Sequence, residues 1–100
     1  MRYITTNASN KIPFETQLML WHLYDSMDQK VKKKDYFQVF DLFINPDGSQ
    51  KIVHFQEEPK WKEEYTLVLN FDKAVNAKVY IIKDELEDGP IETFLLAEDY

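Results

Sequence analysis

Between Pro13 and Val31, apolar residues recur at intervals of three and four, which is the period of an amphipathic α-helix. Proline suits the first position of a helix, and an acidic Glu15 suits the first turn, so we expect the helix to begin at about Pro13. The narrow polar face would leave His22 exposed. The apolar sector is unusually wide, so a sheet should curl around it; it comprises Phe14, Leu18, Leu20, Trp21, Leu23, Tyr24, Met27 and Val31.

After Asp35 the pattern becomes that of β-strands, with aromatic and β-branched residues in short runs between turn residues. The clearest alternation of period two lies in residues 65–71 and predicts a strand with one buried face. A short run near the N-terminus, ended by the polar residues 7–10, predicts a first strand. The expected strands are Tyr3–Thr6, Tyr36–Ile44, about Gln50–Glu57, Tyr65–Phe71, Ala77–Lys83 and Ile91–Ala97.

Turn residues separate these strands. Asn45-Pro46-Asp47-Gly48 predicts a hairpin turn, and the acidic segment Asp84–Pro90 predicts another. Connections of about three to seven residues are too short for parallel crossovers, so strands adjacent in sequence should pair antiparallel as a meander. The expected fold class is α+β: one long amphipathic helix packed on a curled antiparallel sheet of five to six strands. The order would be β-α-β-β-β-β-β, in a single domain over residues 1–100.

The composition agrees with one ordinary globular domain, since 44% of the 100 residues are hydrophobic and 30% are charged. The chain has no cysteine, which excludes disulfides, thiolate zinc sites and cysteine nucleophiles and fits a reducing compartment. The longest apolar runs, such as Leu18–Trp21, are too short for a signal peptide core or a membrane span. We therefore expect a cytoplasmic protein that does not insert into a membrane.

The charge balance disfavours nucleic acid as a partner. The chain has 12 basic and 18 acidic residues, a net charge of -6, and this field repels polyphosphates and anionic lipid surfaces. Arg2 is the single arginine, although arginine is the side chain best suited to phosphate and guanine recognition. The basic run Lys30 to Lys34 coincides with the expected helix end, where cations are favourable, and either caps the helix or docks an anionic partner.

No motif in the sequence carries catalysis. His54 is the best candidate for a functional side chain, but Glu58, the acid on its strand face, would lie about 13 Å away along an extended strand. The two histidines lack metal-binding spacing, the serines lack a glycine-flanked elbow, and the isolated Gly48 and Gly89 cannot cradle a phosphate. The sequence leans away from an enzyme and predicts no catalytic residue, no metal site and no cofactor.

One segment offers a candidate binding surface, which comprises Gln50, His54, Gln56, Glu58 and Trp61. The first four would share one face of a strand. That face could equally be the solvent side of a half-buried sheet, with Val53 and Phe55 pointing inward. Trp61, in the connection after Pro59, would be either a lid on the core or a contact for a partner.

The chain also resembles a known family. The resemblance rests on Ile12-Pro13 before Gln17-Leu18-x-Leu20-Trp21, on Gln38-Val39-Phe40, on the segment from Gln50 to Pro59, and on Leu95-Leu96-Ala97-Glu98-Asp99-Tyr100. This pattern is similar to the small uncharacterised cytoplasmic proteins of low-GC Gram-positive bacteria that are grouped as a domain of unknown function. The resemblance spans nearly the whole chain and implies no reaction, ligand or catalytic residue.

Three functional hypotheses follow. The first is a non-enzymatic protein-interaction module that uses the Gln50–Trp61 segment or an exposed sheet edge, and an edge that pairs with itself would give a homodimer. The second is a small-ligand-binding protein or enzyme with a pocket between helix and sheet, in which His54 and Glu15 titrate. The third is contact with an anionic partner through Lys30 to Lys34.

Overall fold

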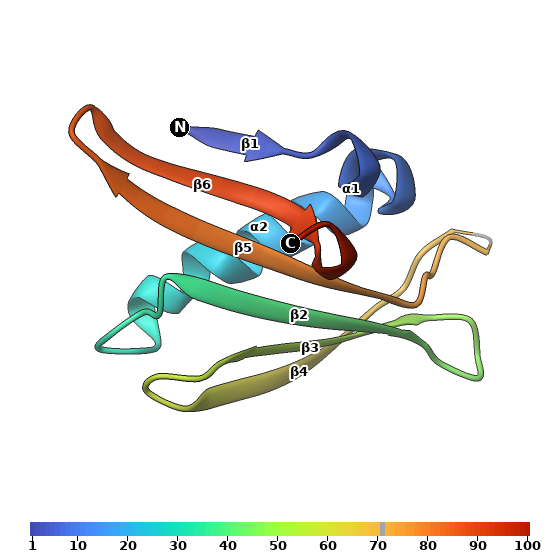
Figure 1. Ribbon diagram of the computed structural model, residues 1–100. Coiled ribbons are helices and arrows are strands. Elements are labelled where there is room, and N and C mark those ends of the chain that lie inside the picture. The colour runs from blue at the N-terminus through green and yellow to red at the C-terminus, as the bar shows by residue number, and fades with distance from the viewer. Residues whose placement is uncertain (71) are drawn as a thin grey trace.

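The computed structural model describes residues 1–70 and 72–100. Two helices and two 3₁₀ turns accompany a six-stranded mixed sheet, so the expected α+β class is confirmed (Figure 1). The helices are α1 (Thr6–Lys11) and α2 (Phe14–Ser26), and the 3₁₀ turns are Met27–Gln29 and Ala97–Asp99. The strands are β1 (Arg2–Ile4), β2 (Phe37–Ile44), β3 (Gln50–Gln56), β4 (Trp61–Leu67), β5 (Ala77–Leu86) and β6 (Gly89–Leu96).

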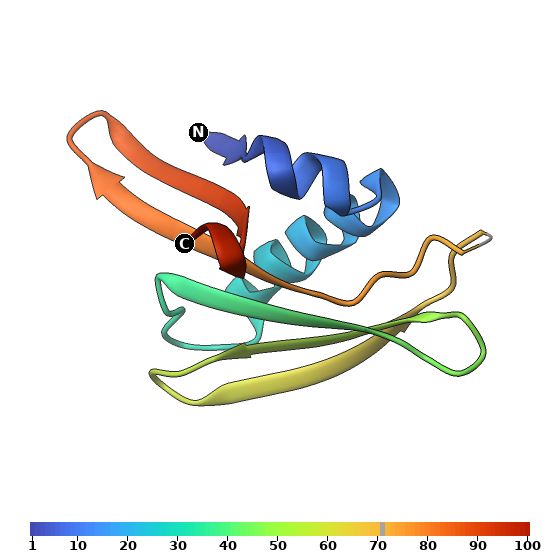
Figure 2. The ribbon, with the colours of Figure 1, turned by 45° about the vertical axis from the view of Figure 1, so that its right-hand side comes forward.

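Helix α2 runs across one face of the sheet, while the C-terminal 3₁₀ turn lies against the opposite face (Figures 1 and 2). We call the face under α2 the inner face and the other one the outer face. Apolar side chains from α2 and from five strands form one core at the inner face. Among its members are Leu20, Leu23, Tyr24, Phe40, Leu42, Ile52, Val79, Ile81, Phe94 and Leu96.

The expected antiparallel meander is wrong in two places. The strand order is β1-β6-β5-β2-β3-β4, so β5 pairs with β2, and β4 is an edge strand that does not touch β5. β4 and β5 lie three strand spacings apart in the sheet, which amounts to only about 14 Å, so a short connection suffices for the crossing. In addition, β1 pairs with β6 in parallel, with Ile4 opposite Phe94. Connection length predicted the hairpins but not the choice of neighbours for β5.

The N-terminal region contains a helix where a turn was expected. Residues 7–10 belong to α1, because the Thr5 side chain accepts a hydrogen bond from the Ala8 amide and Ala8 is fully buried. The amphipathic helix is also shorter than expected, since α2 ends at Ser26. Its wide buried sector is only partly confirmed, since the side chains of Phe14 and Leu18 are 69% and 54% exposed. His22 is exposed as expected.

Strand boundaries in the second half differ from the expected ones. β4 begins at Trp61 rather than Tyr65, and the expected strand's last residue, Phe71, lies outside the described residues. The acidic segment expected to be a turn mostly continues β5 and β6, whose hairpin closes at Gly89 with φ 118°. Gly48, with φ 87°, closes the β2–β3 hairpin as its turn sequence predicted.

Candidate functional site

The outer face of the sheet carries an uninterrupted row of side chains across five strands. Register pairs Lys62 with Phe55, Phe55 with Val39, Val39 with Tyr80, and Tyr80 with Leu95. Four of these five residues are apolar or aromatic, although β-strands with one solvated face alternate apolar and polar residues between the two faces. The outer face is therefore not an ordinary solvated surface.

Aromatic rings form the surface of this row. Phe55 and Tyr80 are half-buried, and they cover Val39, whose side chain is 5% exposed. The C-terminal Tyr100 lies over the same region, with its ring 5.3 Å from that of Phe37 and 5.6 Å from that of Tyr80, both edge to face. Tyr100 thus shields one end of the outer face.

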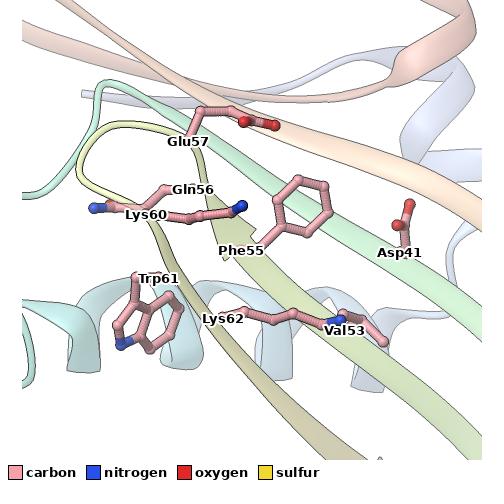
Figure 3. A pocket seen from close by; sticks show the side chains of 8 residues that line it. All are labelled: Asp41, Val53, Phe55, Gln56, Glu57, Lys60, Trp61 and Lys62. Atoms are coloured by element: carbon pink, nitrogen blue, oxygen red, sulfur yellow. The ribbon is translucent and has the colours of Figure 1, made fainter.

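A hollow of about 340 Å³ opens at the other end of the row, near the turn between β3 and β4. Figure 3 shows the ring of Phe55 at its centre, with the side chains of Lys60 and Lys62 extending along it. Trp61 and Glu57 stand at its margins. The hollow is lined by Asp41, Val53, Phe55, Gln56, Glu57, Lys60, Trp61 and Lys62.

Some lysines of the outer face form ion pairs and others do not. Lys51 pairs with Glu64 at 3.1 Å and Lys78 with Asp41 at 3.7 Å. Within residues 1–70 and 72–100, neither Lys60 nor Lys62 lies within 4.0 Å of a carboxylate oxygen. The hollow therefore combines an aromatic floor with two ammonium groups that have no carboxylate partner in this part of the chain.

The residues proposed from the sequence as a binding surface are mostly internal. Gln50 and His54 are 0% exposed and Gln56 is 1% exposed, whereas Glu58 is exposed and Trp61 half-buried. The interpretation of that strand face as the solvent side is wrong, because it is the inner face. The outer face of β3 instead carries Val53 and Phe55, which the same interpretation placed inside.

Hydrogen bonds explain why polar residues of β3 point inward. His54 donates from Nε2 to the Gln38 side-chain oxygen at 2.9 Å, and the Gln38 amide donates to Gln56 at 2.8 Å and to the Asp35 carbonyl at 2.8 Å. Gln56 donates in turn to the carbonyls of Lys33 and Pro59. These buried amides hold the connection before β2 and the turn after β3 against the core.

His54 is held neutral rather than poised for catalysis. Burial, and secondarily the positive charge of Lys34, lowers its pKa to about 3. Its Nδ1 atom is buried and has no hydrogen-bond partner in the part of the chain that the structure describes. The acid opposite it on β4, Glu63, bonds instead to Lys30 and to the Tyr65 hydroxyl. No acid orients this imidazole among the described residues.

Trp61 has features of both roles that the sequence left open, a lid on the core and a contact for a partner. Its ring meets His54 edge to face, with centroids 4.9 Å apart, so it covers part of the core. It also borders the outer hollow. The structure thus supports the lid, and leaves contact with a partner as a proposal.

The basic run divides into residues with different surroundings. Lys34 donates to the Tyr24 carbonyl at 2.7 Å and lies 3.4 Å from the centroid of the Tyr24 ring, so it caps α2 as the sequence suggested. Lys30 pairs with Glu63 at 2.9 Å. Lys32 and Lys33 have no ion pair within the part of the chain that the structure describes.

Residues 1–70 and 72–100 contain no group of three or more histidine, aspartate or glutamate side chains able to hold a metal ion. No helix among them is long and apolar enough to cross a membrane.

Sequence reasoning missed the residues that make up the outer face, namely Phe37, Val39, Tyr80, Leu95 and Tyr100. A signal was present, because β2 and β5 contain apolar residues at consecutive positions, such as Val39-Phe40 and Tyr80-Ile81-Ile82. Consecutive apolar residues in a strand indicate burial on both faces. With helices on one face alone, that pattern indicates an uncovered apolar face.

Fold and site together define a class: a small α+β domain whose sheet is covered by helices on one face and keeps an aromatic surface on the other. The chain belongs to the family DUF960, described as a Staphylococcal protein of unknown function, which matches residues 1–99. The resemblance noted in the sequence is thereby confirmed.

A solved structure supports the fold. The crystal structure of a protein of unknown function from Enterococcus faecalis is similar, with a TM-score of 0.78 and 21% sequence identity. The match covers 99% of this chain and 89% of that one. No curated protein matches the chain.

Proposed function

We propose that this protein is a non-enzymatic protein-interaction module whose binding surface is the outer face of the sheet. The observation that carries the proposal is the row of Phe55, Val39 and Tyr80 across the middle of a face that no helix among the described residues covers. Phe55 and Tyr80 are half-buried and Tyr100 is exposed, so aromatic surface of this face reaches solvent, and apolar surface bordered by polar residues marks interaction sites in soluble proteins. Aromatic residues are also enriched at protein interfaces.

The charges of the surface define the partner's chemistry. Lys60 and Lys62 extend beside the Phe55 ring, and neither forms an ion pair within residues 1–70 and 72–100. A partner that brings carboxylates to these lysines and apolar side chains to the ring would satisfy both features. The partner is therefore an acidic protein surface; the net charge of -6 argues against nucleic acid and membrane. We also propose that the protein works in the cytoplasm, as its lack of cysteine suggests.

Pairing through a sheet edge is the competing mode of interaction. β4 is a seven-residue edge strand, long enough to accept another strand. However, Lys62, Glu63 and Glu64 place three consecutive charges on it, and charges on an edge discourage pairing. The outer face therefore explains an interaction better than the β4 edge does.

A pocket between helix and sheet is less favoured as a function. The space under α2 is filled by core side chains such as Leu20, Phe40 and Ile52, all 0% exposed. The two titratable groups proposed for it do not face each other in a common hollow, because Glu15 is exposed on the first turn of α2 and His54 is enclosed.

Lysine acetylation in cell lysate tests the proposal. A trace of labelled protein, added to a concentrated lysate of its source cells, should show slower acetylation of Lys60 and Lys62 than the same protein in buffer. Lys11, exposed on α1 away from the outer face, is the internal control. Equal reactivity of Lys60 and Lys62 in lysate and in buffer would overturn the proposal.

A pair of variants makes the test specific. Phe55→Ser should abolish the protection of Lys60 and Lys62, because it removes the aromatic centre of the surface. Leu18→Ser, which changes an exposed apolar residue on α2, should leave the protection unchanged. Protection that survives Phe55→Ser but is lost in Leu18→Ser would place the interaction on the helix side and contradict the proposal.

A further inference from the structure

We infer that the partner of the outer face is a second copy of this chain, bound face to face around a twofold axis near Val39. This inference rests on the proposed function and names its partner. Three observations carry it: the distribution of charge on the outer face, the register of the sheet, and the size of the face.

The outer face is acidic at one end and basic at the other. Glu98 and Asp99 follow β6, and Tyr100 rests on Phe37 and Tyr80 of the outer face. The Asp99 carboxylate accepts a hydrogen bond from the Asn7 side chain at 3.2 Å and keeps its charge. Glu98 has no ion pair within residues 1–70 and 72–100. The basic end carries Lys60 and Lys62 beside Phe55, against the exposed carboxylate of Glu57 at the margin of the same hollow. The two ends therefore carry opposite net charge.

The register places Val39 between the two ends. Val39 is opposite Phe55 on β3 and opposite Tyr80 on β5. A twofold axis that lies between the two sheets, parallel to β2 and above Val39, would turn the two outer faces toward each other and lay the Tyr80 side of one copy over the Phe55 side of the other. The acidic tail of each copy would then meet the lysines of its partner, and the same contact would occur twice, as a twofold interface requires.

The face is large enough for a dimer. With strands ~4.8 Å apart and residues ~3.3 Å apart along them, a six-stranded sheet of about seven residues per strand covers on the order of 500 Å² in plan. Side chains that project from the sheet increase the accessible area beyond this figure. Specific interfaces bury roughly 800 Å² on each partner. A face-to-face dimer would therefore have to use the whole outer face, including its projecting side chains.

A twofold dimer through the β4 edge satisfies the charges less well. If β4 paired antiparallel with β4 of a second copy, a twofold axis at Glu63 would place the two Glu63 residues opposite each other. An axis at Glu64 would do the same with the two Glu64 residues. Like charges directly opposite one another destabilise a strand pair. The face-to-face arrangement instead sets carboxylates against lysines.

Charge reversal tests the inference, with sedimentation equilibrium of the purified full chain as the measurement. Wild type should form a dimer whose dissociation constant rises with salt. Lys60→Glu/Lys62→Glu and Glu98→Lys/Asp99→Lys should each weaken self-association at least about tenfold, because each sets like charges together in both contacts. Lys32→Glu/Lys33→Glu, with the same charge change elsewhere, should not weaken it.

The decisive sample is an equimolar mixture of the two reversed variants. In a mixed dimer both tail contacts are again attractive, so the mixture should recover association close to that of wild type. Circular dichroism and thermal unfolding of each variant confirm that it is folded.

A wild-type chain that remains monomeric up to its solubility limit would overturn the inference, as would a dimer whose affinity neither variant changes. If the purified chain is monomeric but Lys60 and Lys62 are protected in lysate, the proposed function stands and the partner is another acidic protein. If the purified chain is monomeric and Lys60 and Lys62 are not protected in lysate, both proposals fail.

Discussion

The imidazole of His54 stacks on the ring of Phe40, with centroids 4.1 Å apart and 23° between the ring planes. Trp61 closes the other side, and the Gln38 side chain accepts the Nε2 proton. A histidine enclosed in this way stays neutral, because the charged form would lose its hydration without gaining a carboxylate. This enclosure predicts how stability depends on pH.

The free energy of unfolding should fall as pH falls below 6.5, because of His54. Its pKa is about 3 in the folded chain and 6.5 when unperturbed, so between these values the unfolded chain binds a proton that the folded chain does not. The contribution of His54 is therefore complete above pH 6.5 and declines toward pH 3. Its slope is at most about 1.4 kcal/mol per pH unit. Urea unfolding measured from pH 7 to 5.5, above the main carboxylate range, isolates this slope.

His54→Gln should remove that slope, although it also lowers stability at pH 7. His22→Gln, at an exposed position on α2, should preserve the slope. A slope that persists in His54→Gln would show that another group causes it, and the neutral, enclosed state of His54 would have to be rejected.

The two faces of β3 show where prediction from sequence ended. Alternation separated Gln50, His54 and Gln56 from Val53 and Phe55, which is right. Hydrophobicity then assigned the inside to the second group, which is wrong. The deciding bonds include those from the Gln56 and Gln50 side-chain amides to the carbonyls of Lys33 and Val75, which are 23 and 25 residues away and cannot be placed by a local pattern.

The fold was predictable where local signals decide it. Period-two alternation and turn residues located the β2–β3 hairpin, and helical spacing located α2. The placement of β5 beside β2 and the parallel pairing of β1 depend on contacts between remote segments. The candidate site was missed for the same reason, because the outer face is defined by the packing of the helices against the opposite face of the sheet.

Gln50 should be essential for the packing of the segment before β5. Its side-chain oxygen accepts from the Val75 amide at 2.8 Å, and its nitrogen donates to the carbonyls of Val75 and Phe43. Gln50→Ala leaves these backbone groups unpaired and creates a cavity, so we expect a loss of about 2–4 kcal/mol. Denaturant unfolding gives the loss, and hydrogen exchange at the Val75 amide should accelerate.

Gln29→Ala is the matched control for this prediction, because Gln29 is exposed in the 3₁₀ turn after α2. It should change stability by less than about 0.5 kcal/mol. Slow exchange at Val75 in Gln50→Ala would mean that the segment is held by its own packing rather than by the amide.

Arg2 should anchor β1. Its guanidinium bonds to Asp25 on α2 and to Glu92 on β6, and it lies 4.5 Å from the centroid of the Trp21 ring. The side chain is 41% exposed, so solvent weakens these contacts and Arg2→Met should cost only about 1 kcal/mol. Amide exchange in residues 2–4 should accelerate while exchange in β3 stays unchanged. Lys11→Met, which removes another exposed cation, should leave amide exchange unchanged in residues 2–4 and in β3. If Arg2→Met also leaves exchange in residues 2–4 unchanged, β1 is held by its backbone pairing alone.

Lys34 should differ from its neighbours in the basic run, because its ammonium group binds a backbone carbonyl in the last turn of α2. Its ammonium group donates to the Tyr24 carbonyl and lies over the Tyr24 ring, and its side chain is 18% exposed. Lys34→Met keeps the aliphatic stem but removes the cap, so thermal unfolding should show a loss of about 1–2 kcal/mol. Lys32→Met and Lys33→Met remove the same charge from exposed positions and should change stability by less than about 0.5 kcal/mol. Equal losses in all three variants would mean that net charge in the run matters rather than the cap at Tyr24. A loss confined to Lys34→Met would assign that lysine to the fold and leave Lys32 and Lys33 as the residues with which to test an anionic partner.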